Sequence, residues 1–205
     1  MVRRPLVAFA LVPLLLAACS DDSPKTDPSA AASAPVPGVT LPAGAMVDLV
    51  PAPDEVPAGM VPIIKGSGPR GLAVVASYSG AATRAQAESS LRSHGFQAAY
   101  VAQYANQATG QVLSVLVSSF ATAEGATSDF SDDQRGTTGT PVQAEQLGDA
   151  SSVTKQTITG SVSSELLLVR FLKGTHTWTL AYQAAPTADP QVGIALAKKL
   201  LERAG

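Results

Sequence analysis

The fold is decided by residues 96–104, FQAAYVAQY, and residues 111–120, QVLSVLVSSF. The second stretch is a short apolar run of strand length, and the polar residues 106–110 between the two stretches supply a turn. The first stretch alternates strictly, which predicts a strand whose one face carries Phe96, Ala98, Tyr100, Ala102 and Tyr104. We therefore expect two consecutive strands here.

Before these strands, the sequence predicts one more strand and a helix. The apolar run LAVVASY at residues 72–78 is bounded by glycines, which is typical of a buried strand. Thr83 and Gln86 have the spacing of a capping box at a helix N-terminus. Gly95 stands where that helix would end in a left-handed conformation.

After residue 120, the sequence predicts two helices and three strands. Thr122 caps a helix, and Asp189 with Pro190 opens a terminal helix over residues 191–203. The strands are expected at residues 153–159, 165–172 and 175–184, the last two joined by a tight hairpin at Lys173 and Gly174. The order β-α-β-β-α followed by β-β-β-α predicts an α+β fold: a mainly antiparallel sheet with helices packed on one face.

The N-terminus predicts export. Arg3 and Arg4 precede an apolar run over residues 5–18 that is too short to span a membrane, which is typical of a signal peptide. Residues 16–19, LAAC, resemble the lipobox of bacterial lipoproteins. The resemblance implies cleavage before Cys19, acylation of that cysteine with diacylglyceryl and chains such as palmitate, and a lipid anchor at the extracytoplasmic face of the cell membrane. General secretion and twin-arginine export both stay open.

The chain divides into three expected parts. Residues 1–18 are the signal peptide, residues 19–62 are the lipidated cysteine with a tether rich in Pro, Ala and Ser, and residues 63–205 are a globular domain. Extended Pro-rich chain rises about 3.1 Å per residue, so residues 20–39 would lift the domain by roughly 60 Å. Residues 41–64 carry enough apolar side chains that we expect them to pack partly along the domain edge.

Three stretches of the globular part look like segments of secreted lipoproteins from actinobacteria. They are VPIIKGSGP at residues 61–69, LRSHGFQAAY at residues 91–100 and SSFATAEGATSDF at residues 118–130. The resemblance implies a fold and an extracytoplasmic location, and it brings no catalytic residues.

Composition and motifs exclude several classes of function. Without Arg3 and Arg4 the chain has 12 basic and 16 acidic residues, a net charge of −4, and it has no basic stripe, so we expect no nucleic-acid partner. Cys19 is the only cysteine, which excludes an internal disulfide and a thiolate metal cluster. A G-x-G-x-x-G pattern at residues 66–71 precedes a predicted strand, whereas a dinucleotide site needs it to open a helix. We expect no cofactor.

The two histidines limit acid–base chemistry. His94 is expected to cap the C-terminus of the first helix, with no carboxylate beside it. His176 shares a strand face with Trp178 and Tyr182. If that face meets solvent, the three residues are a candidate ligand-binding strip; if it points inward, His176 lies at the rim of the core.

The acidic residues of the second helix do not predict a metal site. Asp129, Asp132 and Asp133 lack the alternating ligands, central glycine and terminal glutamate of a calcium loop. We expect them at a solvated helix end. No G-x-S-x-G elbow marks a serine nucleophile either.

Three hypotheses about function follow. The first is a non-enzymatic binding or interaction module that is anchored to the membrane through Cys19 and recognises an envelope protein or an apolar ligand. The second is a carrier for an apolar ligand such as an envelope lipid, with Phe96, Tyr100 and Tyr104 lining a cavity. The third is a hydrolase assembled around His176, which requires Ser or Asp side chains within hydrogen-bond reach of the imidazole.

Replacing Cys19 with Ala should release the protein from the membrane, because the acyl chains then have no attachment atom. We expect the Cys19→Ala protein, once its signal peptide is removed, to be released from the membrane or mislocalised, with the unfolding midpoint of the domain unchanged from wild type. Retention of a processed Cys19→Ala variant in the membrane fraction would contradict lipid anchoring.

Overall fold

The computed structural model describes residues 41–79, 83–136 and 138–204. Cys19, the expected signal peptide and the tether as far as residue 40 lie outside the described residues. Within the described residues, no helix has both the length and the apolar composition needed to cross a membrane.

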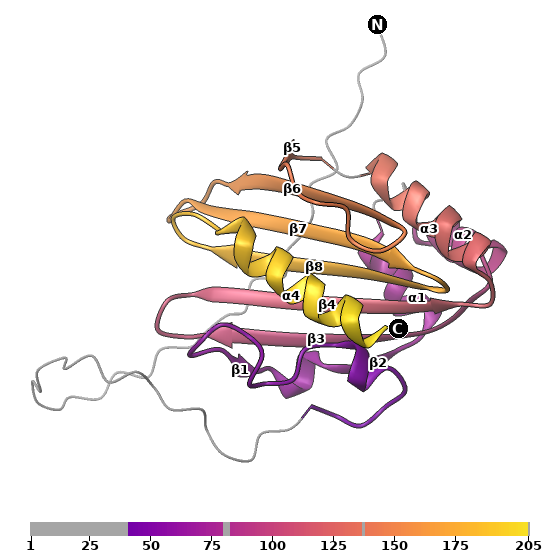
Figure 1. Ribbon diagram of the computed structural model, residues 1–205, viewed down its shortest axis with the longest axis horizontal. Coiled ribbons are helices and arrows are strands. Elements are labelled where there is room, and N and C mark those ends of the chain that lie inside the picture. The colour runs from indigo at the N-terminus through magenta and orange to yellow at the C-terminus, as the bar shows by residue number, and fades with distance from the viewer. Residues whose placement is uncertain (1–40, 80–82, 137, 205) are drawn as a thin grey trace, which may run out of the picture. The chain divides into compact units, whose positions relative to one another are not determined.

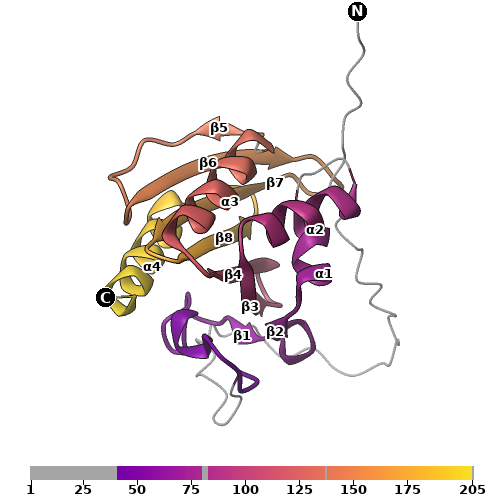
Figure 2. The ribbon, with the colours of Figure 1, turned by 90° about the vertical axis from the view of Figure 1, so that its right-hand side faces the viewer.

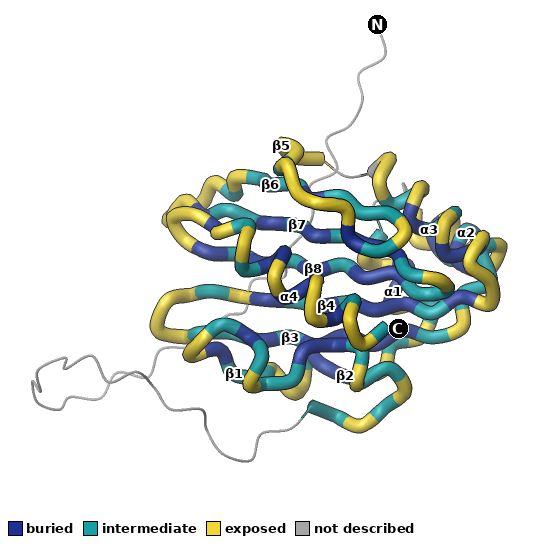
Figure 3. Tube along the Cα trace, in the orientation of Figure 1, coloured by how far each residue is buried: buried dark blue, intermediate teal, exposed yellow. Residues whose placement is uncertain are grey.

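An eight-stranded antiparallel sheet forms the centre of the fold (Figure 1). Its strand order is β1-β3-β4-β8-β7-β6-β5, and β2 also pairs with β3. The central strands carry most of the buried residues, whereas the ends of the hairpins are exposed (Figure 3). The strands are β1 (Val61–Pro62), β2 (Gly68–Arg70), β3 (Phe96–Asn106), β4 (Gln111–Phe120), β5 (Thr140–Pro141), β6 (Ala150–Ile158), β7 (Ser164–Lys173) and β8 (His176–Ala184).

Helices cover both faces of this sheet. Figure 2 shows α4 on one side and α1, α2 and α3 on the other. The α-helices are α1 (Leu72–Val75), α2 (Arg84–Ser93), α3 (Ala123–Gly136) and α4 (Pro190–Arg203), and the 3-10 helices are η1 (Val47–Leu49), η2 (Ile64–Gly66) and η3 (Ala76–Tyr78). The α+β class and the antiparallel sheet are confirmed. The expectation of helices on one face holds for α1, α2 and α3, whereas α4 covers the opposite face because each face carries its own apolar cluster.

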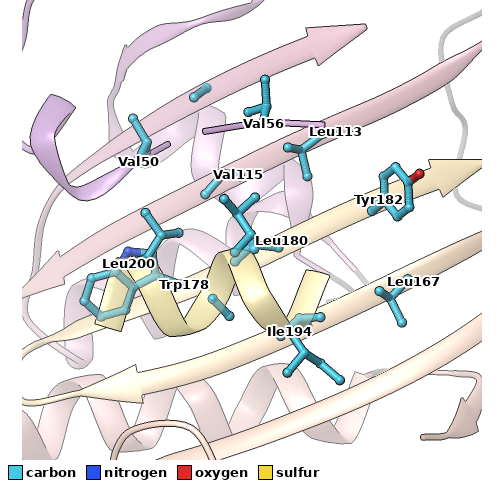
Figure 4. Close-up of a cluster of buried hydrophobic side chains, with 14 of the residues drawn as sticks. Val50, Val56, Leu113, Val115, Leu167, Trp178, Leu180, Tyr182, Ile194 and Leu200 are labelled. Carbon is cyan, nitrogen blue, oxygen red and sulfur yellow. The ribbon is translucent and has the colours of Figure 1, made fainter. Parts of the chain in front are cut away.

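The larger apolar core lies between the sheet and α4 (Figure 4). Phe171 of β7 stacks on Trp178 of β8, with ring centroids 4.8 Å apart. Gly193 allows α4 to approach the sheet closely, because a Cβ there would lie 2.7 Å from Leu167 Cδ2. The helix adds the apolar side chains of Ile194, Leu196 and Leu200.

Residues 41–62, which we call the strap, pack into this same core. Their buried apolar residues are Val50, Val56 and Met60. Arg203 of α4 donates to the carbonyl of Val50 at 3.1 Å and pairs with Glu55. The folded domain therefore begins before residue 63, earlier than the expected boundary, because the apolar residues of the strap are needed to complete the core beside α4.

Buried aromatic side chains hold the backbone of the strap. Trp178 Nε1 donates to the carbonyl of Leu49 at 2.9 Å, and the hydroxyl of Tyr104 donates to the carbonyl of Pro51. Burial is the main cause that raises the pKa of Tyr104. These hydrogen bonds satisfy polar groups that would otherwise be buried without partners.

Residues 72–78 form α1 and η3 and not the predicted strand. A short apolar run between glycines suits a strand and a buried helical turn equally well, because its length and hydrophobicity do not reveal its period. Val75 and Ala76 belong to the same apolar cluster as Ala87 and Leu91 of α2. The edge of the sheet beside β3 is occupied by β1 and β2 instead.

A β-bulge moves Phe96 off the predicted aromatic face. The register of β3 against β4 shifts between Phe96 and Ala98. Phe96 consequently lies edge-on to Phe120, with ring centroids 6.0 Å apart, and not beside Tyr100. An alternating pattern does not reveal a bulge, because the bulge inserts one extra residue without changing the composition.

The ends of helices α2 and α4 agree with the capping residues and the glycine that the sequence predicted there. Thr83 caps α2 by accepting a hydrogen bond from Gln86 N at 3.2 Å, and Asp189 caps α4 by accepting one from Gln191 N at 2.9 Å. Gly95 follows α2 at a φ of +75°, as its position predicted. The caps and the glycine stop are confirmed.

The Tyr104→Phe variant should be destabilised by about 1–2 kcal/mol, because it leaves the carbonyl of Pro51 buried without its donor. Tyr182→Phe is the matched control, since Tyr182 is buried on the same face and its hydroxyl makes no hydrogen bond with another described residue. Urea unfolding measures both variants. Equal losses in the two variants would show that the hydrogen bond to the strap contributes nothing.

Candidate functional site

A cavity of about 330 Å³, lined by both polar and apolar side chains, lies on the sheet face opposite α4. Its floor comes from β4, β7 and β8, and its walls come from η3, α2 and α3. The polar side chains that line it are Ser79, Ser90, His94, Ser118, Asp129, Asp132, Asp133, Arg135, Arg170, Thr177 and Thr179. We call this space the cavity.

Hydroxyl groups form the floor of the cavity. Ser118 of β4 lies directly opposite Thr177 of β8, and the two residues are only 3% and 9% exposed. Neither hydroxyl makes a hydrogen bond with another described residue. Both hydroxyls line the cavity and are accessible to water or a ligand there, so this floor favours an occupant that can exchange hydrogen bonds.

Helix α3 places two carboxylates beside an arginine of the sheet. Arg170 of β7 donates from Nη1 to the backbone carbonyl of Asp133 at 2.8 Å, and its Nη2 lies 3.7 Å from Asp133 Oδ2. Asp129 lies one turn earlier on α3, with its side chain 20% exposed. Burial is the main cause that raises the pKa of Asp129 to about 7, the charge of Asp133 raises it further, and the charge of Arg170 opposes both. Burial likewise raises the pKa of Asp133, again opposed by Arg170.

His94, at the C-terminus of α2, lies between two carboxylates. Its Nδ1 is 4.0 Å from Asp129 Oδ1, and its Nε2 is 3.6 Å from Asp132 Oδ2. The Nδ1 atom is buried without a hydrogen-bond partner among the described residues, and burial lowers the pKa of the imidazole. The expectation of no carboxylate beside His94 is therefore wrong. The three aspartates are likewise not at a freely solvated helix end, because α3 packs along the sheet beside Arg170.

Gly125 sets the distance between α2 and α3. A Cβ at this position would overlap the carbonyl oxygen of His94. The amide of Gly125 also donates to Thr122 Oγ1 at 3.0 Å, which caps α3 as predicted. The close approach of the two helices keeps the imidazole of His94 beside Asp129.

The predicted strip of His176, Trp178 and Tyr182 lies on the α4 face and not in the cavity. Trp178 and Tyr182 are buried in the core. His176 is half-buried, with Nδ1 3.3 Å from Thr175 Oγ1 and its ring centroid 5.7 Å from that of Trp178. No Ser or Asp side chain of the described residues forms a hydrogen bond or ion pair with its imidazole. The face points inward, which is the second of the two arrangements considered.

The three aromatic residues considered for an apolar cavity are not brought together. Tyr100 and Tyr104 are fully buried in the core beside α4, and the hydroxyl of Tyr100 donates to the carbonyl of Pro42 in the strap. Phe96 lies on the other face beside Phe120. The aromatic side of β3 is thus occupied by protein atoms.

The side chains of the cavity offer hydrogen-bonding groups and charges. No group of three or more His, Cys, Asp or Glu side chains within the described residues has the geometry of a metal site. The cavity offers hydroxyls that both donate and accept, together with a carboxylate and an imidazole. A small polar molecule can be held there by hydrogen bonds and one charge interaction.

Sequence reasoning missed the floor residues Ser118, Thr177 and Thr179 and the wall residue Arg170. A signal was present, because these polar residues alternate with the apolar residues of their strands. That alternation is typical of a solvent-exposed face. This face lies inside the molecule because helices α2 and α3 cover it.

The raised pKa of Asp129 predicts a pH-dependent contribution to stability. A carboxyl whose pKa is raised on folding stabilises the fold fully below its unfolded value of 3.8, and the contribution is lost as the pH rises through about 7. The side chain of Asp129→Asn stays neutral at every pH, so the variant does not lose this contribution. The stability of the variant minus that of wild type should therefore be about 1–3 kcal/mol larger at about pH 8 than at about pH 5.

Urea unfolding at the two pH values measures this difference. His94, whose lowered pKa destabilises the fold as the pH falls, contributes with the opposite sign in both proteins. Asp149→Asn is the control, because interactions with Gly174 and Lys173 hold the pKa of Asp149 below its usual value and its carboxylate is charged at both pH values. A pH-independent effect of Asp129→Asn would show that Asp129 is ionised throughout this range.

Comparison with known proteins gives a relationship of fold. No protein-family model and no curated protein sequence matches this chain. The fold is similar to that of the extracellular domain of PknH from Mycobacterium tuberculosis, with a TM-score of 0.55 and 12% sequence identity over 77% of this chain and 93% of that chain. At this identity the likeness shows that this chain shares the fold of an extracellular mycobacterial domain.

Proposed function

We propose that this chain is a lipid-anchored, extracytoplasmic binding module whose ligand site is the cavity between the sheet and helices α2 and α3. The observation that carries the proposal is the pair of residues Ser118 and Thr177 on the floor of the cavity, whose hydroxyls make no hydrogen bond with another described residue. A sheet face that served only for packing would carry apolar side chains there. The ligand is expected to be a small polar molecule, because the cavity volume is about 330 Å³.

The proposed location rests on the N-terminal sequence and on the fold. The apolar run over residues 5–18 and the LAAC sequence at residues 16–19 favour export and lipidation at Cys19. The similarity in fold to an extracellular domain supports the same side of the membrane. Lipidation then holds the cavity at the membrane, within the reach of the tether formed by residues 20–39.

The proposal favours binding without catalysis. The charged groups at the cavity wall are largely satisfied by one another, as Arg170 is by Asp133 and Asp132 is by Arg135. No serine of the described residues forms a hydrogen bond with His94, which a serine nucleophile activated by this imidazole would need. Turnover of any ester, phosphate or glycoside substrate by the purified protein would argue for an enzyme instead.

Ligand binding in the cavity is tested by titrating the isotope-labelled protein with a library of small cationic, anionic, zwitterionic and neutral polar compounds. We expect amide chemical shifts to change for residues of α2, α3 and β8 that line the cavity. Ser118→Leu should weaken the binding at least about tenfold, because the larger side chain fills the floor.

Ser119→Leu is the matched control. Ser119 follows Ser118 on β4, so its side chain points to the opposite side of the strand, away from the cavity. Binding should be unchanged in this variant. Shifts confined to the α4 face, or no compound that binds in the cavity, would contradict the proposal.

A further inference from the structure

We propose that the cavity binds a small organic cation that carries both an ammonium and a hydroxyl group. The ammonium group lies beside Asp129, and the hydroxyl group lies on the floor formed by Ser118 and Thr177. This inference rests on the proposed function, since it names the class of ligand for the same cavity.

One carboxylate of the cavity wall makes no direct ion pair with a lysine or arginine. Asp132 pairs with Arg135, and Asp133 pairs with Arg170. Asp129 has no lysine or arginine within ion-pair distance among the described residues. Its neighbour is His94 at 4.0 Å, an imidazole whose pKa is lowered by burial. A cation from outside the protein is the missing partner.

An anionic ligand suits this wall poorly. The wall carries three aspartates against two arginines, and each arginine is already paired with an aspartate. A second negative charge beside Asp129, whose side chain is mostly buried, would add repulsion. A neutral ligand would leave the Asp129 carboxylate buried without a counter-charge.

The floor adds a requirement for hydrogen bonding. The hydroxyls of Ser118 and Thr177 both donate and accept, and neither has a partner among the described residues. A ligand hydroxyl exchanges hydrogen bonds with them, whereas a purely alkyl ammonium displaces water from them without replacing its hydrogen bonds. The combination of one carboxylate and two hydroxyls therefore selects a hydroxylated amine.

Binding of the cation should depend on pH through Asp129. The titratable and charged groups that face this carboxyl are His94 from α2, Arg170 from β7, and Asp132, Asp133 and Arg135 from α3. Only the ionised carboxylate attracts an ammonium group, and the pKa of Asp129 is about 7. The affinity should therefore be on the order of 10- to 30-fold higher at about pH 8 than at about pH 5.5.

Three probes of similar size separate charge from shape: ethanolamine, ethylene glycol and glycolate. Each is titrated into the purified isotope-labelled protein, and chemical shifts of residues lining the cavity are followed. We expect ethanolamine to bind at least about tenfold more tightly than ethylene glycol near pH 8, and glycolate to bind more weakly than both.

Asp129→Asn should remove both the preference for ethanolamine and its pH dependence. This substitution reproduces the neutral carboxyl, so the variant is expected to fold, and circular dichroism checks this. Asp149→Asn is the control, because Asp149 accepts a hydrogen bond from Gly174 at the β7–β8 hairpin and does not line the cavity. It should bind ethanolamine as wild type does.

The outcomes separate the two proposals. Failure of ethanolamine to bind in the cavity, equal binding of glycolate, or an unchanged preference in Asp129→Asn would overturn the cation proposal. Binding of glycolate or ethylene glycol in the cavity would still support the proposed function. If no compound of any charge class binds there, the proposed function fails as well.

Discussion

The alternation of side chains along β4 and β8 is the constraint on which the rest of this structure depends. Val117 and Trp178 are register partners and point into the core beside α4, while the next register pair, Ser118 and Thr177, points to the other side. Because successive residues of a strand face opposite sides, the same two strands build an apolar core on one face and the floor of a polar cavity on the other.

The two faces therefore have different roles. The α4 face holds the larger core, and the strap completes it through hydrogen bonds from Trp178 and Tyr104 to backbone carbonyls. The opposite face has a smaller apolar cluster around Phe120 and Phe130, and beside it the helices α2 and α3 cover polar residues. The stability gained on the α4 face offsets the cost of the partly buried charges on the opposite face.

Local sequence signals predicted most of the helices and strands but few of the contacts between them. The strand β4, the caps at Thr83 and Asp189 and the stop at Gly95 agree with the structure, because each depends on hydrogen bonds or backbone angles within a few residues. The helix at residues 72–75 was missed, since a short apolar run has no visible period. The bulge beside Phe96 was missed because it changes the facing of side chains without changing the sequence pattern.

The sequence by itself determined the secondary structure of the long elements, the α+β class and the absence of thiol chemistry in the domain, because these follow from composition and local periodicity. Only the tertiary structure brought His94 to Asp129 and Arg170 to Asp133, and only it covered Ser118 and Thr177 with helices. These contacts join α2, α3 and the sheet across long stretches of chain. Their burial and the resulting pKa of Asp129 depend on three-dimensional packing, which no local pattern of residues encodes.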